Sequence, residues 1–463
     1  MRTYIALFIC AALSATVAAQ GPQNRPPSVA ITGGTLINVI TGEQIKDSRI
    51  LIEGDRIKQL GRAGEITIPQ SAQTIDARGK WIIPGSIDMH THGAGRRDLP
   101  LELYLAQGVT TIRDVAGQLT SLRITRDEII SGKRVGPRLF FAGYILDGDP
   151  PVWPQGSLLI DTPERAESAV NFLIDQGADC IKVYNNISEP VLGAIIRTAR
   201  MRNIPVTGHA PRSMTMAQAV ELGMDCLEHI RITGKDLLPL DEANKLDPLP
   251  VARREALLWQ RFDLGSEKMN RLISLLAQRK VFLEPTLTAD EVMSVDGYEA
   301  QAADPNNRFL PRRLFDEWAR RPTPDMFKVP PELKQAAAAG FKKRKQFVAM
   351  CKTAGVPIIA GTDGAFLGKL LPGFGLQREL ELLVQSGLKP IEAIQAATIN
   401  AARLLKRERE LGVIEANRVA DIVILDADPL EDIRNTRKIH LVMKGGQTFD
   451  PTRLLNGQNP AQR

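Results

Sequence analysis

Two histidines separated by one residue, His90 and His92, end the segment that runs from Trp81. The first part of this segment is apolar and is bounded by turn-forming residues, which predicts a buried strand. Residues i and i+2 of a strand point to the same side, so both imidazoles are expected to face one cavity. The chain has only five histidines. The spacing favours a metal site, although a pair of structural histidines is an open alternative for this motif alone.

Further side chains that can take part in metal binding stand at the ends of other apolar segments: Lys182, His209, His229 and Asp363. In a barrel of parallel strands the C-terminal ends of all strands meet at one face, so these residues are expected to converge with the first two histidines. Taken singly, His209 could be a hydrogen-bonded core residue and Asp363 a turn residue. Taken together, the set predicts a metal-dependent active site.

A series of strands and helices is needed to position these residues, and the sequence contains one. Apolar segments of strand length alternate with helical patterns between residues 84 and 404, which favours the α/β class and a (β/α)8 TIM barrel. The expected strands lie within 81–92, 109–114, 138–142, 180–184, 205–209, 226–229, 281–286 and 357–363. Two connections, 231–280 and 288–350, are too long for simple crossovers, and we expect them to form a partial lid.

The two ends of the chain are rich in short strand patterns separated by turns. Residues 20–83 contain several such patterns, with turn signals such as Gly33-Gly34 between them. Residues 405–463 add two more, at 420–425 and 440–443. Short alternating strands with close turns indicate an antiparallel unit. We therefore expect both ends to build one small β-sandwich domain beside the barrel.

The composition is that of a soluble globular protein, with 24% charged residues and a net charge of +6. The basic run at 342–345 is expected to be the solvated face of a helix, and nothing indicates a nucleic-acid partner. Cys180, Cys226 and Cys351 lie in or beside apolar segments. They predict free buried thiols rather than a disulfide framework.

Residues 1–19 have the features of a secretory signal peptide. Arg2 supplies a positive charge, residues 5–17 are apolar, and Ala18 and Ala19 offer a cleavage site. The apolar run is too short to span a bilayer. We expect cleavage near Ala19, no membrane anchor in the mature chain, and a secreted or periplasmic protein.

The motifs at the first and last barrel strands are the most specific in the chain. Residues 84–92 read Pro-Gly-Ser-Ile-Asp-Met-His-Thr-His, and Gly361-Thr362-Asp363 ends the eighth expected strand. They resemble signatures of the amidohydrolase superfamily, specifically of its binuclear prolidase-like and imidazolonepropionase-like branch. The helical segment 389–402 is similar to the element that follows the barrel in many members. Asn417 stands where relatives commonly carry glycine, and asparagine tolerates the left-handed turn expected there.

The resemblance implies two divalent metal ions, zinc first, with manganese, cobalt or iron as alternatives. One ion would be held by His90, His92 and Asp363, and the other by His209 and His229. CO₂ would form a carbamate on Lys182 that bridges the ions together with a hydroxide. By the same resemblance the hydroxide attacks a polarised carbonyl of an amide-type bond, and Asp363 shuttles the proton to the departing nitrogen.

The residues that would select the substrate are less defined. Arg212 could bind a substrate carboxylate, and a surface arginine is an equally good interpretation. Tyr144 and Tyr184 lie on expected pocket loops. Two departures separate the chain from the dipeptidases of the branch: residues 143–148 lack their histidine-bearing glycine-rich loop, and residues 209–212 lack the tyrosine expected two positions past the histidine. The expected partner is a small-molecule amide or dipeptide, and a homo-oligomer is compatible with the sequence.

Other functions share part of this pattern. A cyclic-amide or lactone hydrolase would use the same site. A mononuclear deaminase would need no lysine on the fourth strand and normally has a glutamate shortly after the fifth-strand histidine, where this chain has Arg212-Ser213-Met214. A secreted binding barrel without catalysis would have lost metal ligands, and the sequence lacks none of them.

Overall fold

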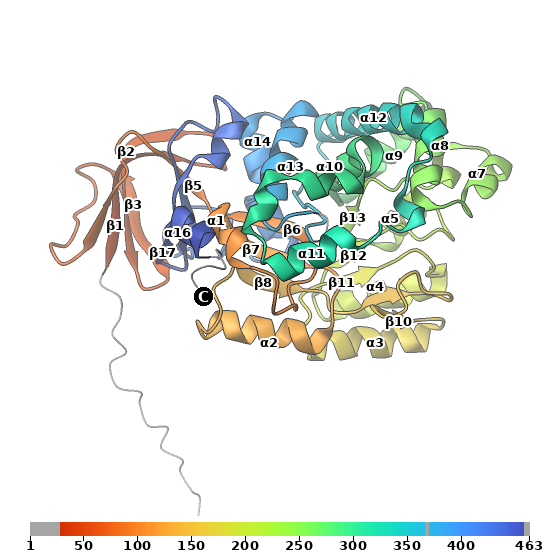
Figure 1. The fold of residues 1–463 in the computed structure, drawn as a ribbon, viewed down its shortest axis with the longest axis horizontal. Helices are drawn as coiled ribbons and strands as arrows, with labels where there is room; N and C mark the ends of the chain where they lie inside the picture. The colour runs from red at the N-terminus through yellow and green to blue at the C-terminus, as the bar shows by residue number, and fades with distance from the viewer. Residues whose placement is uncertain (1–27, 366–369, 458–463) are drawn as a thin grey trace, which may run out of the picture.

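The computed structural model describes residues 28–365 and 370–457, and its largest part is a ring of parallel strands surrounded by helices (Figure 1). Three strands form one sheet in the order β6-β7-β8, and six form another in the order β10-β9-β11-β12-β13-β14. Their bounds are β6 Ser86–Thr91, β7 Val109–Asp114, β8 Arg138–Phe141, β9 Ile145–Asp147, β10 Ser157–Leu159, β11 Ile181–Val183, β12 Val206–Gly208, β13 Cys226–Glu228 and β14 Phe282–Glu284. Strands β9 and β10 were not expected from the sequence.

Backbone hydrogen bonds link the two sheets on both sides. The amide of Asp179 donates to the carbonyl of Phe141 at 2.8 Å, which joins β8 to the start of β11. On the other side, segment 357–364 lies between β14 and β6, where the amide of Met89 donates to the carbonyl of Ala360 at 3.0 Å. The expected eighth strand is thus in place but makes only isolated bridges. Its regular geometry ends at Asp363, whose φ of 59° is outside the extended region.

Strands from both ends of the chain share one further sheet, seen at the left of Figure 1. The order is β17-β16-β15-β5-β1-β2-β3, with β4 beside β1. The bounds are β1 Val29–Ile37, β2 Gln44–Glu53, β3 Arg56–Arg62, β4 Gln73–Asp76, β5 Trp81–Pro84, β15 Ile422–Leu425, β16 Ile439–Lys444 and β17 Gln447–Phe449. The expected strand from Trp81 to His92 is therefore two strands, β5 in this sheet and β6 in the barrel. They separate at Gly85, where a side chain would collide with Thr110.

Helices cover the outside of the ring, and several begin at a residue whose side chain caps the helix. The side chains of Thr162, Thr215 and Ser266 accept hydrogen bonds at the starts of α3, α5 and α9. The bounds are α1 Glu102–Ala106, α2 Leu119–Ile130, α3 Pro163–Asp175, α4 Glu189–Met201, α5 Met216–Leu222, α6 Gly234–Leu237, α7 Leu240–Leu246, α8 Val251–Arg261, α9 Glu267–Arg279, α10 Leu287–Glu291, α11 Arg312–Arg320, α12 Lys334–Thr353, α13 Phe374–Gln385, α14 Pro390–Ala396, α15 Ile399–Leu404 and α16 Pro451–Asn456. The single helix expected over 389–402 is divided at Thr398 into α14 and α15.

The two long connections are folded. Residues 231–280 contain α6 to α9, and residues 288–350 contain most of α10, α11, α12 and several short helical turns. The basic run at 342–345 lies in α12, as expected for a helix, but its interpretation as a solvated face was wrong for Arg344. That side chain is buried because it forms ion pairs with Glu255 and Asp290, each at 3.2 Å.

Several other expectations can be compared directly with the structure. Cys180, Cys226 and Cys351 are free and buried, as predicted. Asn417 has a φ of 68°, the left-handed conformation expected there. Within residues 28–365 and 370–457, no helix is both long and apolar enough to cross a membrane. The predicted signal peptide, residues 1–19, lies outside the described residues.

Candidate metal centre and active-site cavity

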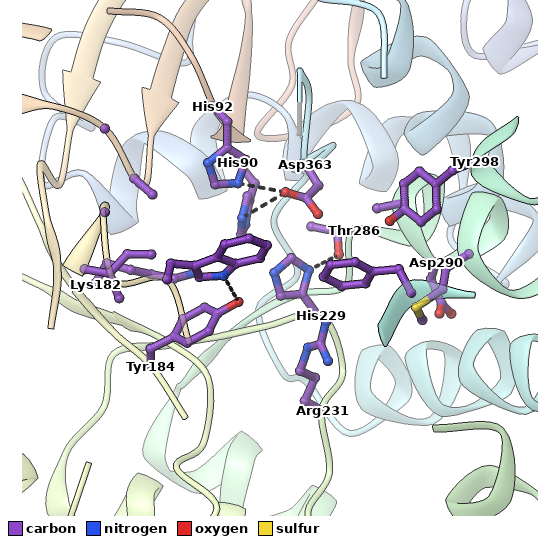
Figure 2. A pocket seen from close by; sticks show the side chains of 18 of the residues that line it. His90, His92, Lys182, Tyr184, His229, Arg231, Thr286, Asp290, Tyr298 and Asp363 are labelled. Carbon is purple, nitrogen blue, oxygen red and sulfur yellow. Dashed lines mark hydrogen bonds and ion pairs between the residues drawn. The ribbon is translucent and has the colours of Figure 1, made fainter. Parts of the chain in front are cut away.

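The C-terminal ends of the barrel strands bring the predicted metal ligands together (Figure 2). Nε2 of His92 lies 2.8 Å from Oδ1 of Asp363, and Nε2 of His90 lies 3.6 Å from the same oxygen. The ring centroids of His90 and His229 are 4.5 Å apart, and those of His209 and His229 are 5.0 Å apart. The structure therefore places these five side chains at one face of the barrel.

The hydrogen bonds of two histidines fix which ring nitrogen is free. Nδ1 of His209 lies 2.8 Å from Oδ1 of Asn185, a carbonyl oxygen that can only accept a hydrogen bond. Nδ1 of His229 lies 2.7 Å from Oγ1 of Thr286, whose hydroxyl already donates to the carbonyl of Pro285. In both rings Nδ1 must therefore donate, and Nε2 keeps its lone pair. This is how a metal-binding histidine is usually oriented by its second nitrogen.

An unpartnered nitrogen atom at the same place supports a metal site. Nε2 of His209 is buried and has no hydrogen-bond partner among the described residues. Such an atom is rare in folded proteins unless a ligand satisfies it. The donor atoms of His90, His92 and Asp363 also lie within 4.8 Å of one another. Imidazole and carboxylate donors suit zinc and similar divalent ions, so the residues present fit the cofactor that the sequence predicts.

Neighbouring residues hold the ligands in place. Asp88 accepts hydrogen bonds from the backbone amide of His90 at 3.2 Å and from the amide and hydroxyl of Thr362 at 3.1 and 2.7 Å. It thereby ties the first strand to the segment that carries Asp363. Gly208, directly before His209, has a φ of 139°, and a side chain there would collide with the carbonyl oxygen of Val183. Only glycine fits at this position without strain.

Lys182 lines the same cavity and is almost completely buried, with 2% of its surface exposed. Its ammonium contacts Oε2 of Glu228, which is buried as well. The lysine therefore points into the barrel rather than to its outer side. Burial lowers the pKa of Lys182 to about 7, which increases the share of neutral amine near neutral pH. The neutral amine is the form that can take up CO₂, so the predicted carbamate is compatible with this environment.

A buried charge network lies beneath the ligands, and sequence analysis missed it. Arg113 on β7 pairs with Glu284 on β14 at 2.7 Å and with Glu228 on β13 at 3.4 Å, and its Nε donates to the carbonyl of Met89 at 2.7 Å. All three charged side chains are at most 1% exposed. The network thus connects strands β6, β7, β13 and β14 under the metal site. A signal was present in the sequence for Glu228 and Glu284, because each is the one charge in an otherwise apolar strand.

Replacement of Arg113 by methionine is expected to destabilise the protein by about 3–5 kcal/mol, because it removes the cation paired with the buried carboxylate of Glu284 and one of the two cations beside Glu228. Arg123→Met is the matched control, since Arg123 is exposed on α2. The control is expected to change stability by less than about 0.5 kcal/mol. Urea unfolding of both variants measures the difference. Equal stability of the two variants would show that the Arg113 network contributes nothing.

The electrostatics of the site favour the protonation states that a metal requires. Burial lowers the pKa of His90 and His209 well below the usual value, and the charge of Lys182 lowers it further. Burial has the same effect on the pKa of His229. Burial alone would raise the pKa of Asp363, but its contact with His92 and the nearby imidazoles lower it on balance. Neutral imidazoles next to an ionised carboxylate can bind a divalent cation without losing protons.

A cavity of about 550 Å³ opens over these residues. Its wall includes His90, His92, Lys182, His229 and Asp363. The rest comes from the loops after the second, third and fourth barrel strands, from the connections 231–280 and 288–350, and from the segment after β14. Lining residues from these regions are Gln118, Trp153, Arg231, Glu255, Asp290, Met293, Tyr298, Arg321, Phe327 and Arg344. The connection 288–350 thus forms one wall of the cavity.

The three predicted substrate residues lie in different positions. Tyr184 lines the cavity, and its ring centroid is 4.2 Å from that of His209. Tyr144 is not among the described residues that line the cavity. Its hydroxyl donates a hydrogen bond to Gln118, and Gln118 does line the cavity. Arg212 is also absent from the described part of the wall, and its backbone amide donates to the carbonyl of Asn185. Arg231, which sequence analysis did not select, does line the cavity.

Comparison with known families agrees with this site. The pattern described as the amidohydrolase family matches residues 81–449, a range that contains every predicted metal ligand. The chain belongs to the amidohydrolase family. The resemblance seen in the sequence motifs and the expected fold class, a (β/α)8 barrel with a small β domain, are confirmed. Family membership places this amidohydrolase among hydrolases that act on carbon–nitrogen bonds.

Individual relatives are distant. This amidohydrolase is 22% identical to an adenine deaminase of Mesorhizobium japonicum over 87% of its own length and 54% of the deaminase, so it spans about half of that relative. It is 23% identical to an ochratoxinase of Aspergillus niger, with 92% and 89% of the two chains covered. The crystal structure of a Xaa-Pro dipeptidase with bound methionine superimposes with a TM-score of 0.66, 22% identity, and coverage of 91% and 100%. A bottromycin amidohydrolase gives a TM-score of 0.72 at 21% identity, with coverage of 94% and 91%.

Proposed function

We propose that this amidohydrolase is a metal-dependent hydrolase that cleaves an amide-type carbon–nitrogen bond in a small molecule. The observation that carries the proposal is the convergence of four histidines, Asp363 and Lys182 beside one cavity. The free Nε2 atoms of His209 and His229 support it further. Relatives named adenine deaminase and ochratoxinase, and the dipeptidase structure, fit a reaction at a carbon–nitrogen bond.

In the proposed reaction His90, His92 and Asp363 would hold one divalent ion, His209 and His229 would hold a second, and a carbamate on Lys182 would supply a further anionic ligand. When bound, such ions lower the pKa of coordinated water from about 15.7 toward about 7 and polarise a carbonyl group. Asp363 then takes up a proton from the attacking water at its carboxylate. It delivers that proton to the departing nitrogen, so it serves as general base and then as general acid.

Residues around the ligands exclude water and keep the geometry fixed. Asn185 and Thr286 orient the two imidazoles that bind the second ion. Asp88 fixes the segment before Asp363, so the carboxylate is held beside His92. The connection 288–350 shields the cavity from one side and serves as its partial lid. Preorganisation of this kind reduces the rearrangement needed in the transition state.

We also propose that the mature chain acts outside the cytoplasm, in the periplasm or as a secreted protein. The support is the sequence of residues 1–19, with its positive start, apolar run and small residues before Gln20. Expression with this segment and analysis of the N-terminus of the mature protein would test the proposal. A mature chain that still begins at Met1 would contradict it.

The hydrolase proposal is tested by a substrate panel of dipeptides, N-acyl amino acids, cyclic amides and lactones. We expect turnover of at least one amide, its loss on chelation, and its recovery when zinc or manganese is returned. Undiminished activity in a preparation shown by elemental analysis to be metal-free would exclude the proposed mechanism. A protein with both ions bound and no turnover of any member would favour the non-catalytic binding barrel instead.

A further inference from the structure

Four cationic side chains line the active-site cavity: Lys182, Arg231, Arg321 and Arg344. Lys182 contacts Glu228, and Arg344 pairs with Glu255 and Asp290. Arg321 is exposed to solvent. Arg231 differs from the other three, because it is partly buried and forms no hydrogen bond or ion pair with any residue of the described ranges.

The neighbouring acidic residues do not need Arg231 as a counter-charge. Glu255 is paired with both Arg254, at 3.3 Å, and Arg344, at 3.2 Å. Oδ1 of Asp290 is paired with Arg344 and accepts a hydrogen bond from Ser294. Two carboxylates thus face two guanidinium groups. Neither carboxylate pairs with Arg231, so the charge of Arg231 has no paired counter-charge among the described residues.

The backbone places Arg231 in the wall in an unusual way. His229 and Ile230 both have positive φ values, 66° and 49°. A left-handed conformation is uncommon for any side chain and a true outlier for a β-branched residue such as isoleucine. It turns the chain at the end of β13, so that Arg231 lies beside His229 (Figure 2). Strained backbone of this kind is most often found where a functional side chain must be placed.

The buried part of the guanidinium group lacks any partner. Nε of Arg231 is inaccessible to solvent and has no acceptor among the described residues. The Nη atoms are not among the buried unpartnered atoms and form no hydrogen bond with any described residue, so an anion in the cavity can reach them. A carboxylate matches the planar guanidinium fork with two parallel hydrogen bonds. The cavity therefore offers an anion-binding position two residues from a predicted metal ligand.

The rest of the cavity suits flat, apolar groups. The whole chain has only four tryptophans and five tyrosines. Three of these nine residues, Trp153, Tyr184 and Tyr298, line this one cavity together with Phe327 and Met293. The rings of Trp153 and Phe327 are nearly parallel, with an interplanar angle of 9° and centroids 6.3 Å apart. Aromatic walls of this kind favour aromatic ligands through offset stacking and edge contacts.

We propose that the substrate is an amide that carries both an aromatic group and a carboxylate, with the carboxylate bound by Arg231 and the ring held by Trp153, Tyr298 and Phe327. An amide formed between an aromatic acid and an amino acid is the simplest member of this class. The assignment rests on the proposed amide hydrolysis for its chemistry. The binding position itself depends only on the cavity, so it can be tested without turnover.

Calorimetric titration with two ligands that have no scissile bond distinguishes binding of the carboxylate by Arg231 from binding of the ring by the aromatic side chains. Hydrocinnamic acid has a ring and a carboxylate, and hydrocinnamyl alcohol has the same ring without the charge. In the metal-loaded protein we expect Arg231→Gln to weaken binding of the acid by about 10- to 100-fold, the loss of a charged hydrogen bond, and to leave the alcohol unaffected. Phe327→Ala is expected to weaken both ligands by about threefold to tenfold.

Two matched variants control for general effects. Arg253→Gln removes an exposed arginine of α8, and Phe172→Ala removes a phenylalanine of α3 that is 47% exposed. Both are expected to bind the two ligands as the wild type does. Thermal melts of all variants establish that each is folded. If Arg231→Gln binds the acid as tightly as wild type, the carboxylate binds elsewhere, for example at the metals, and the assignment is wrong.

Hydrolysis is measured in parallel on three amides: N-benzoyl-phenylalanine, its alcohol counterpart N-benzoyl-phenylalaninol, and N-acetyl-alanine. We expect kcat/KM of the wild type to be highest for N-benzoyl-phenylalanine. Arg231→Gln is expected to raise the KM for N-benzoyl-phenylalanine and to leave the KM for N-benzoyl-phenylalaninol unchanged. A wild type that prefers N-acetyl-alanine would overturn the aromatic assignment. Failure to cleave any amide, together with Arg231-dependent binding of hydrocinnamic acid, would refute the hydrolase proposal and leave the binding position intact.

Discussion

Replacement of Asp363 by asparagine is expected to lower kcat by about 10³-fold or more while the protein keeps most of its metal. General acid–base groups commonly contribute about 10²- to 10⁴-fold, and an amide cannot take up and release the proton. Asparagine can still offer a weak oxygen ligand, and the histidine ligands remain. It also tolerates the φ of 59° at this position, so little backbone strain is expected.

Elemental analysis and steady-state kinetics on the same preparation measure this effect. Asp241→Asn is the matched control, because Asp241 is exposed on α7 and lies outside the cavity wall. The control is expected to keep wild-type metal content and kcat. An Asp363→Asn protein that contains its metal and retains more than a tenth of the wild-type kcat would show that another group moves the proton.

Lys182→Ala is expected to lose most of its metal and nearly all activity, because the predicted carbamate would supply one oxygen to each ion. Small carboxylates such as acetate or propionate are expected to restore part of the activity by occupying the vacated position. Lys182 is 2% exposed and lies at the ligand cluster, so a small anion would have to enter through the cavity. Metal content and activity are measured with and without propionate.

The contact between Lys182 and Glu228 raises a second possible role for the lysine, namely to balance the charge of Glu228. Experiments must distinguish this role from that of carbamate carrier. If the lysine only balances the charge of Glu228, the double variant Lys182→Ala/Glu228→Gln should regain metal and activity, since it removes both charges. If the lysine carries the bridging group, the double variant should stay metal-poor and inactive. Lys182→Arg is a further control, because a guanidinium group keeps the positive charge and cannot form the carbamate.

The convergence of the predicted ligands could be expected from the sequence because barrel geometry does most of the positioning. His90 and His92 share one side of a strand, and the other ligands stand at strand ends that a barrel must gather at one face. The alternation of apolar segments with helical patterns also indicated the barrel between residues 84 and 404. These features depend on local pattern, which a single sequence contains.

Other parts of the site depend on long-range contacts that no local pattern contains. Arg212 and Arg231 each follow a strand-end histidine within three residues, yet only Arg231 lines the cavity. The left-handed backbone at His229 and Ile230, directly before Arg231, is not indicated by the sequence. Arg344 was expected to be solvated because it lies in a basic run. Its partners are 89 and 54 residues away along the chain, at Glu255 and Asp290.

The most direct test of the metal-dependent mechanism follows activity while metal is returned to a metal-free preparation. Zinc or manganese is added stepwise to protein of known concentration, with an amide substrate found in the panel. The proposed ligand arrangement predicts that activity rises from near zero and reaches its maximum at about two equivalents of metal per chain. Full activity before any metal is added would contradict the account.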